Sequence, residues 1–343
     1  MAKVSVSTKD VTILAVTNRS PTQGNASTFG DGRGKLSCEQ FTMRQVRSST
    51  DAKPAAAVVS PGSDPLRSFV TASHRQLDDK AFGQAVDHMQ KAGADRAIVF
   101  VHGYNYSYQE AVFRLAQLSA DAGVRAVPIL FSWPSRADFR GYVADRDSTT
   151  YARDDLVELL TMLSRSRSPR RVAVIGHSMG AWLVMEALRQ LRLQGRDDVV
   201  ARLEVGLAAP DIDIDVFRRQ AAVVGRLSPP LTVLVSADDR ALAVSSRITG
   251  GRPRLGLARA DDPETQQIAR EEGLGIIDIS TLPATDGLNH DRFVTFAARY
   301  ATAAQDGRLV GRVQQAGVYL LNTTGRILSE PFSQTARLLG GSP

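Results

Sequence analysis

The chain has 343 residues, of which 43% are hydrophobic and 23% charged, enough for one large globular domain or two ordinary ones. Its formal charge of +6 comes mainly from scattered arginines, and we expect the densest run, residues 165–171, to be a solvated loop and not a nucleic-acid-binding surface. The only cysteine, Cys38, excludes intramolecular disulfides and cysteine-rich metal sites, and no apolar run reaches the roughly 18 residues that a membrane span needs.

Strands and helices are predicted to alternate through most of the chain. Two strands are expected over 11–17 and 39–46, and a loop rich in Ser, Pro, Ala and Asp over 48–64. Helices are then predicted over 77–89, 108–121, 153–163 and 292–303, and strands over 96–101, 126–131, 171–175, 203–208, 231–236 and 275–279. Such alternation predicts an α/β fold with a mostly parallel central sheet flanked by helices on both faces.

The predicted organisation is a single domain over residues 1–304. A small cap-like insertion is expected near 133–153, and residues 305–343 form a C-terminal extension without a motif. Because the extension carries apolar residues, we expect it either to pack on the body or to mediate association. The apolar run 11–16 is too short for a signal-peptide core, and the expected location is cytoplasmic.

The stretch around Ser178 is typical of a nucleophile elbow. The predicted strand over 171–175 is apolar from Val172 onward and leads into Gly176-His177-Ser178-Met179-Gly180, and apolar residues at helical spacing follow. In such a turn from strand to helix the serine hydroxyl is raised above the sheet, and the glycines allow the flanking backbone segments to approach closely. Because the pentapeptide alone also arises by chance, the prediction depends on the strand before it and the helix after it. Ser178 is the predicted nucleophile.

A serine hydroxyl needs a base to take its proton, and histidine is the usual one. The chain has five histidines, but only His290 follows Ser178. It lies in a loop after the last predicted strand and before the closing helix, where the chain order of serine, acid and histidine requires the base. The side chain of His177 is expected to point away from the nucleophile, and His102 belongs to another motif. His290 is therefore the predicted base.

The acid that orients this histidine should stand at the carboxyl end of a strand between Ser178 and His290. Asp239, after the strand over 231–236, fits best, with Asp238 as its neighbour. Asp211, after the preceding strand, is the alternative acid. Either carboxylate could instead make an ordinary turn or helix cap at a strand exit.

An oxyanion hole needs two backbone N–H groups aimed at the developing negative charge. Met179, directly after the nucleophile, is expected to supply one of them. The strand over 96–101 runs into His102-Gly103-Tyr104. Gly103 would let the backbone approach, Tyr104 would supply the second N–H, and His102 would brace the loop.

Together these motifs resemble the α/β-hydrolase superfamily, and within it a bacterial esterase/lipase branch that is grouped as a domain of unknown function (DUF900). The resemblance covers about residues 96–300, and it implies the fold and a serine-hydrolase mechanism but little about the substrate. The segments that carry it are Phe100 to Asn105, Phe131 to Ser135, Tyr142 with Asp145 to Asp147, the elbow, Ala209 to Asp213, and Asp239 to Leu242; the opening Ala15 to Arg19 is similar as well.

We therefore predict a carboxylic ester hydrolase that forms an acyl-enzyme on Ser178, with a small-molecule ester as substrate and without cofactor or metal. Trp133, just after a predicted strand, is a candidate for the substrate pocket. Thioesterase, amidase and acyltransferase activities would use the same residues, and a non-catalytic ligand-binding protein of this fold is the alternative of another class. The acyl chain, the alcohol group and the oligomeric state stay open.

Overall fold

The computed structural model describes residues 10–22, 25–45, 69–165, 171–305, 319–321 and 327–329. For 25–27, 300–305 and the last two segments it describes the backbone alone. The loop predicted over 48–64, most of the arginine-rich run 165–171 and much of the extension over 305–343 lie outside the described residues.

One eleven-stranded sheet runs through the described chain in the order β11-β10-β9-β8-β7-β6-β4-β5-β1-β2-β3. From β9 to β1, neighbouring strands are parallel. Both edges are antiparallel, with β2 and β3 beyond β1 and with β10 and β11 beyond β9. The strands are β1 (Asp10–Thr22), β2 (Asn25–Gln45), β3 (Phe69–Leu77), β4 (Arg96–Val101), β5 (Ala126–Ser132), β6 (Val172–His177), β7 (Leu203–Ala208), β8 (Thr232–Val235), β9 (Gly275–Asp278), β10 (Tyr319–Leu321) and β11 (Ile327–Ser329).

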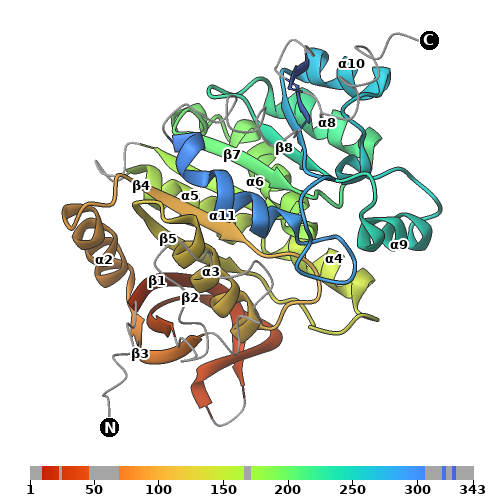
Figure 1. The fold of residues 1–343 in the computed structure, drawn as a ribbon. Coiled ribbons are helices and arrows are strands. Elements are labelled where there is room, and N and C mark those ends of the chain that lie inside the picture. The colour runs from red at the N-terminus through yellow and green to blue at the C-terminus, as the bar shows by residue number, and fades with distance from the viewer. Residues whose placement is uncertain are drawn as a thin grey trace, which may run out of the picture.

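Helices cover both faces of the sheet (Figure 1). On one face α3 and α11 pack on Phe100, and on the other α2, α5, α6 and α8 pack on Val99 and Val101. Successive side chains of β4 therefore enter different cores, because side-chain direction reverses at each residue of a strand. The helices are α2 (Asp79–Lys91), α3 (Tyr108–Ala122), α4 (Tyr142–Tyr151), α5 (Arg153–Arg165), α6 (Met179–Leu193), α7 (Asp197–Val200), α8 (Ile214–Val224), α9 (Arg240–Ile248), α10 (Pro263–Glu272) and α11 (Arg292–Gln305).

The predicted α/β class is confirmed, and β4 and β7 coincide with the ranges predicted for them. Part of the C-terminal extension packs on the body, because β10 pairs with β9. The sequence patterns did not predict the strands β3, β10 and β11 or the helices α4, α7, α8, α9 and α10. These helices are short and bury few apolar side chains (α10 buries Thr265, Ile268 and Ala269), so a hydrophobic period is hard to recognise in them.

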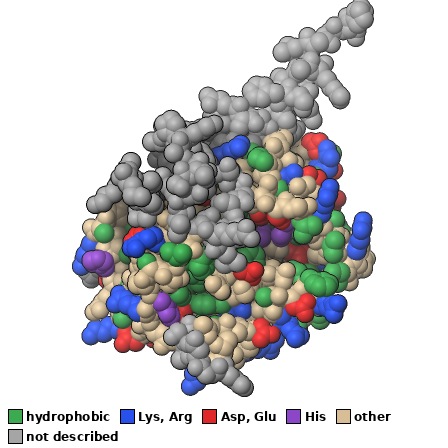
Figure 2. Space-filling view, turned by 60° about the horizontal axis from the view of Figure 1, so that its bottom comes forward, with side chains coloured by type: hydrophobic (Ala, Val, Ile, Leu, Met, Phe, Trp, Pro, Cys, Tyr) green, Lys and Arg blue, Asp and Glu red, His purple; other side chains and the backbone are tan. Residues whose placement is uncertain are grey.

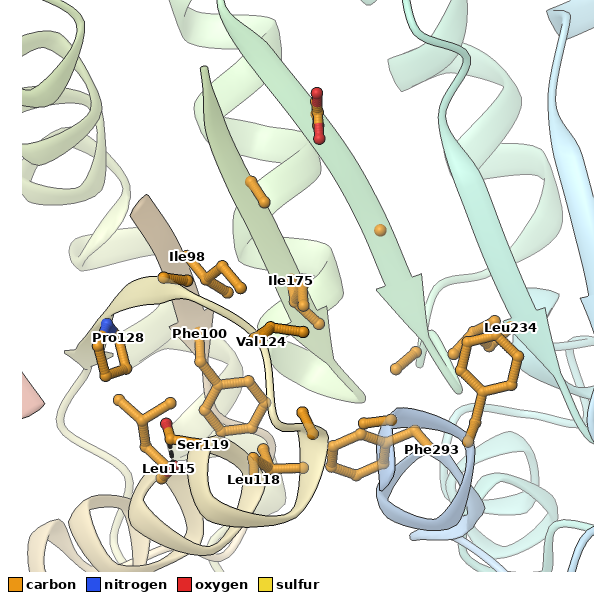
Figure 3. A pocket seen from close by; sticks show the side chains of 18 of the residues that line it. Ile98, Phe100, Leu115, Leu118, Ser119, Val124, Pro128, Ile175, Leu234 and Phe293 are labelled. Carbon is orange, nitrogen blue, oxygen red and sulfur yellow. Dashed lines mark hydrogen bonds between the residues drawn. The ribbon is translucent and has the colours of Figure 1, made fainter. Parts of the chain in front are cut away.

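A cavity of about 330 Å³ lies between the sheet and the helices α3 and α11 (Figure 3). It forms where β6 and β7 present Ala173 and Gly206 to this face, while buried parallel strands usually carry bulky apolar residues. The rest of the lining is mostly apolar and includes Ile98, Phe100, Leu115, Ile175, Leu234 and Phe293.

The Gly206→Ala variant is expected to raise the free energy of unfolding by about 0.5–1 kcal/mol, because glycine inside a strand loses more backbone entropy on folding than alanine. The added methyl would enter the cavity, where the nearest described atom is Cγ1 of Ile175 at 4.0 Å. Urea unfolding measures the change. Gly176→Ala is the matched control and should lose stability, because its Cβ would lie 2.7 Å from Cα of Ala181. A lower free energy of unfolding for Gly206→Ala would contradict the claim that the cavity has room for a methyl group at this strand.

Candidate active site

Ser178 lies between the end of β6 and the start of α6. Its φ of 55° and ψ of −121° are strained for a residue with a side chain, and the residue is 5% exposed. Two glycines make this turn possible. A Cβ on Gly176 would lie 2.8 Å from the carbonyl oxygen of Gly180, and one on Gly180 would lie 2.4 Å from that of Val101. The local backbone thus has the form that the elbow motif predicts.

Asp239 and His290, which are 51 residues apart, meet at the ends of two loops. Nδ1 of His290 lies 2.7 Å from Oδ2 of Asp239. The other carboxylate oxygen of Asp239 accepts the N–H of Leu242 at 3.0 Å and so caps α9. Because the cap holds this 1% exposed carboxylate, one oxygen points at the imidazole while the other stays fixed to the helix.

The loop that carries His290 is held by carboxylates of its own. Asp286 accepts the backbone N–H of His290 at 3.0 Å, and Asp291 accepts the N–H of Thr285 at 2.7 Å. The residues directly before the acid and the base are also bonded to each other. The side-chain amide of Asn289 donates to the carboxylate of Asp238 at 2.9 Å. The loop therefore presents His290 in one orientation.

The surroundings of His290 raise its pKa above the usual value. Burial favours the neutral imidazole and acts to lower the pKa, but the hydrogen bond and the charge of Asp239 outweigh it. A neutral His290 with its proton on Nδ1 would leave Nε2 as an acceptor for a hydroxyl proton. The pair is therefore suited to general-base chemistry.

His290 lies beside the elbow. Its ring centroid is 4.7 Å from that of His177, the residue before Ser178, and its carbonyl oxygen is 3.4 Å from Nε2 of His177. Within the described residues the Ser178 hydroxyl forms no hydrogen bond with Nε2 of His290. Such bonds are often long in unliganded active sites and tighten when substrate binds. The structure thus pairs Asp239 with His290 and places His290 beside His177, the residue before Ser178.

Asp211, the alternative acid, has other partners. Its carboxylate accepts the hydroxyls of Tyr142 at 2.9 Å and Ser245 at 2.5 Å, and it forms an ion pair with the buried Arg254 at 3.2 Å. Its backbone N–H donates to the carbonyl oxygen of Ser178 at 3.2 Å. Asp211 therefore joins α4 and α9 behind the nucleophile, and its carboxylate is not bonded to His290.

The two predicted oxyanion donors flank Ser178. Met179 begins α6 directly after the serine, and Tyr104 follows Gly103, where a Cβ would lie 2.9 Å from Cβ of Ser178. Glycine is therefore needed for the close approach of this loop. Neither the N–H of Met179 nor that of Tyr104 is hydrogen-bonded within the described part of the chain. Both are available to a negatively charged oxygen.

Trp133 supports this loop from inside the protein. It is fully buried, stacks on His102 with ring centroids 4.9 Å apart, and donates its indole N–H to the carbonyl oxygen of His102 at 2.8 Å. The place of Trp133 in the substrate pocket stays a prediction. His102 braces the loop as predicted, with Nδ1 2.8 Å from the carbonyl oxygen of Gly103.

A buried arginine from β1, to which the sequence analysis assigned no role, holds the same loop. Arg19 is 1% exposed and donates to the carbonyl oxygens of Tyr106 at 2.8 Å and Ser135 at 2.9 Å. Burial lowers the pKa of its guanidinium to about 10. Asp145 of α4 faces it and accepts the hydroxyl of Ser135 at 2.6 Å. Asp145, within the insertion predicted over 133–153, thus supplies the acidic part of this support. The signal in the sequence for the role of Arg19 was a charged residue that follows a buried apolar stretch of a strand.

Acid should destabilise the fold through His102. Burial, reinforced by the charge of Arg19, lowers the pKa of its imidazole from 6.5 to about 3, so the unfolded chain binds a proton that the folded chain excludes. The stability contributed by the neutral His102 is therefore present above pH 6.5 and is lost as the pH falls. We expect His102 to contribute a loss of about 2 kcal/mol between pH 7 and pH 5, measured by urea unfolding. Burial also lowers the pKa of His177, which adds to the loss, whereas the raised pKa of His290 partly offsets it. His102→Gln should weaken this dependence; an equal dependence in both proteins would exclude His102 as its source.

Residues 79–305 match the model of a protein family described as alpha/beta hydrolase of unknown function (DUF900). The chain belongs to this family. The matched region runs from α2 through α11 and includes the elbow, the loop at Tyr104 and the Asp239–His290 pair. None of the curated proteins matches the chain.

Two solved structures of hydrolases are similar to this α/β hydrolase. One is named as a cell surface hydrolase from Lactobacillus plantarum WCFS1, at 10% identity and a TM-score of 0.39, and the similarity covers 61% of this chain and 92% of that one. The other is named as a hydrolase from Agrobacterium vitis S4, at 13% identity and a TM-score of 0.30, with coverage of 72% and 86%.

Two further features bear on what the α/β hydrolase could bind. Among the described residues, no group of three or more His, Cys, Asp and Glu side chains is arranged to hold a metal ion. In the same part of the chain, every helix is too short or too polar to cross a membrane.

Proposed function

We propose that this α/β hydrolase is a serine hydrolase that cleaves carboxylic esters through an acyl-enzyme. One observation carries the proposal: Ser178 is held at a positive φ between β6 and α6, beside an imidazole whose Nδ1 is bonded to a buried carboxylate. A strained serine next to an oriented base is the arrangement that turns a hydroxyl into a nucleophile.

In the first half of the reaction, the hydroxyl oxygen of Ser178 attacks the ester carbonyl carbon, and Nε2 of His290 takes the hydroxyl proton. Asp239 keeps the other imidazole proton on Nδ1 and stabilises the imidazolium that forms. The N–H groups of Met179 and Tyr104 donate to the tetrahedral oxyanion. As the C–O bond breaks, His290 returns its proton to the leaving alcohol.

In the second half, a water molecule attacks the acyl-enzyme and His290 again acts as the base. The same two N–H groups stabilise the second oxyanion. Collapse of this intermediate breaks the bond to Ser178, and the proton returns from His290 to the serine oxygen. The carboxylic acid leaves and the free enzyme is restored.

Labelling with a fluorophosphonate probe tests the nucleophile without knowledge of the substrate. We expect phosphonylation of Ser178 in the folded protein, located by peptide mass spectrometry, and no labelling after denaturation. Ser246, a partly exposed serine on α9, is the internal control and should stay unmodified. Absence of label on Ser178 in folded protein would favour a non-catalytic ligand-binding protein.

A panel of esters, thioesters and amides of graded acyl length separates the activities that share these residues. We expect esters to be hydrolysed faster than amides, since an alcohol leaves more readily than an amine. A preference for thioesters, or transfer of the acyl group to an added alcohol in place of water, would redirect the assignment to a thioesterase or an acyltransferase.

A further inference from the structure

Exposed hydrophobic side chains gather around the candidate active site. Among the described residues, eight large hydrophobic side chains are exposed, and five of them lie on three segments next to the site. We call these five the apolar rim: Phe139 (71% exposed), Val143 (70%), Val244 (50%), Ile248 (55%) and Leu288 (50%). Single exposed apolar residues are common, but a cluster around one site indicates a binding surface.

One part of the rim follows from the loop before α4. Phe139 comes directly after Asp138, whose carbonyl oxygen accepts the hydroxyl of Tyr104 at 3.3 Å. Val143 follows Tyr142, whose ring packs edge-on against that of Tyr104 with centroids 5.6 Å apart. Phe139 and Val143 are therefore chain neighbours of residues that contact the proposed oxyanion-hole loop.

The other part of the rim lies across the site on α9 and on the His290 loop. Val244 precedes Ser245, whose hydroxyl donates to Asp211 at 2.5 Å. The carbonyl oxygen of Leu288 accepts the N–H of Arg240 at 2.9 Å, which joins the His290 loop to the start of α9. The rim thus has one part next to the loop at Tyr104 and another on α9 and the loop that carries His290.

The outward face of α9 is amphipathic in composition. Arg240, Val244, Arg247 and Ile248 are exposed, and their spacing of four, three and one residues puts them on one side of the helix, while Leu242 and Ser245 are buried. This face combines branched apolar side chains with cations and carries no acidic residue. Helices that lie on membrane surfaces have this composition.

The charges on the rim favour an anionic surface. Arg140, Arg240 and Arg247 form no ion pair within the described residues. The guanidinium of Arg140 lies 5.2 Å from the ring centroid of Phe139, so a cation and an aromatic ring are presented together. Three exposed acidic residues lie on or next to these segments, Asp138, Asp147 and Asp238. Oδ1 of Asp138 accepts the N–H of Arg140, and Asp238 forms an ion pair with Arg292. In Figure 2, acidic side chains lie directly beside the histidines just right of centre, and hydrophobic and basic side chains are interspersed farther to the right.

We propose that the apolar rim docks on the surface of an anionic lipid bilayer and thereby presents lipid esters to Ser178. The apolar side chains would enter the headgroup region, and the unpaired arginines would contact lipid phosphates. The choice of lipid esters as substrate class rests on the proposed function, whereas docking on the bilayer does not. The two can therefore fail separately.

The test is co-sedimentation of the full chain with phosphatidylcholine vesicles, with and without phosphatidylglycerol. We expect binding to the anionic vesicles that weakens with salt. The Val244→Glu/Ile248→Glu double variant should reduce the bound-to-free ratio by about tenfold or more, because two charges replace two apolar contacts with the lipid. Leu193→Glu is the matched control: Leu193 is 58% exposed at the end of α6, outside the rim, and its replacement should leave binding unchanged.

Hydrolysis of a short, monomeric ester separates docking from folding and chemistry. We expect the double variant to hydrolyse such an ester at the wild-type rate and to be slower only on esters in anionic vesicles. Ser178→Ala should bind vesicles like the wild type, so an inactive enzyme does not obscure the docking result. A wild-type protein that stays in the supernatant, or a double variant that binds as well as wild type, would overturn the proposal.

Discussion

Ser178→Ala is expected to lower kcat for a short p-nitrophenyl ester by on the order of 10⁴- to 10⁶-fold, since the acyl-enzyme of the proposed mechanism forms on the serine oxygen. The residual rate would come from binding and from the oxyanion donors Met179 and Tyr104. Initial rates under saturating ester, with protein concentration set by absorbance, provide the measurement. Ser246→Ala on α9 should keep the wild-type rate.

A second variant separates the loss of the nucleophile from a loss of folding. Because Ser178 adopts a φ of 55°, a residue without a Cβ would relieve backbone strain there. We expect Ser178→Gly to be as inactive as Ser178→Ala and yet more stable than wild type by about 1 kcal/mol in urea unfolding. Near-normal turnover in either variant would show that another residue carries the acyl group.

Asp239→Asn is expected to lower kcat by about 10³- to 10⁴-fold with little change in KM, because the amide cannot stabilise the imidazolium and favours the wrong tautomer of His290. The substitution keeps the size of the side chain, and Oδ1 can still cap α9 through the N–H of Leu242. Circular dichroism should therefore be unchanged. The measurement is a steady-state comparison with wild type on the same ester.

Asp211→Asn is the matched control for this assignment. Its carboxylate pairs with the buried Arg254 at 3.2 Å, so neutralising it leaves a cation without its partner, and we expect a loss of stability of about 3 kcal/mol or more. The catalytic rate at a temperature where the variant is folded should fall far less than in Asp239→Asn. The reverse order of the two kcat values would make Asp211 the acid.

The pH profile gives the same assignment an independent readout. His290 must be neutral to act as a base, and its pKa in the fold lies above 6.5. We expect kcat/KM to fall below that raised pKa as the pH is lowered. In Asp239→Asn the hydrogen bond and charge that raise the pKa are gone, so the acid limb of the residual activity should move to lower pH. An acid limb at the same pH in both proteins would show that Asp239 does not raise the pKa of His290.

Much of the fold could be predicted from hydrophobic patterns. Strands such as β4 and β7 are mostly buried and mostly apolar, as is usual for parallel strands inside a sheet. Arg96 at the start of β4 and Glu204 within β7 are their charged residues. Helix α4 was missed for the opposite reason, because its buried side includes Asp145, Ser148 and Thr149. The Asp145 carboxylate is satisfied by hydrogen bonds from Asn105, Ser135 and Arg136, which lie outside the helix. Such partners are invisible in a local pattern.

The sequence by itself determined the candidate nucleophile and base. The elbow motif singled out Ser178, and His290 was the one histidine after it, so both predictions used chain order and local pattern alone. Only the tertiary structure decided which aspartate bonds to the imidazole. Asp239 and Asp211 each follow a strand, and their local sequence does not show that Asp239 faces His290 whereas Asp211 faces Arg254. It also placed Trp133 in the interior and Arg19 under the oxyanion-hole loop. The physical reason is the same in each case: hydrogen-bond partners and burial are set by contacts between residues far apart in the chain.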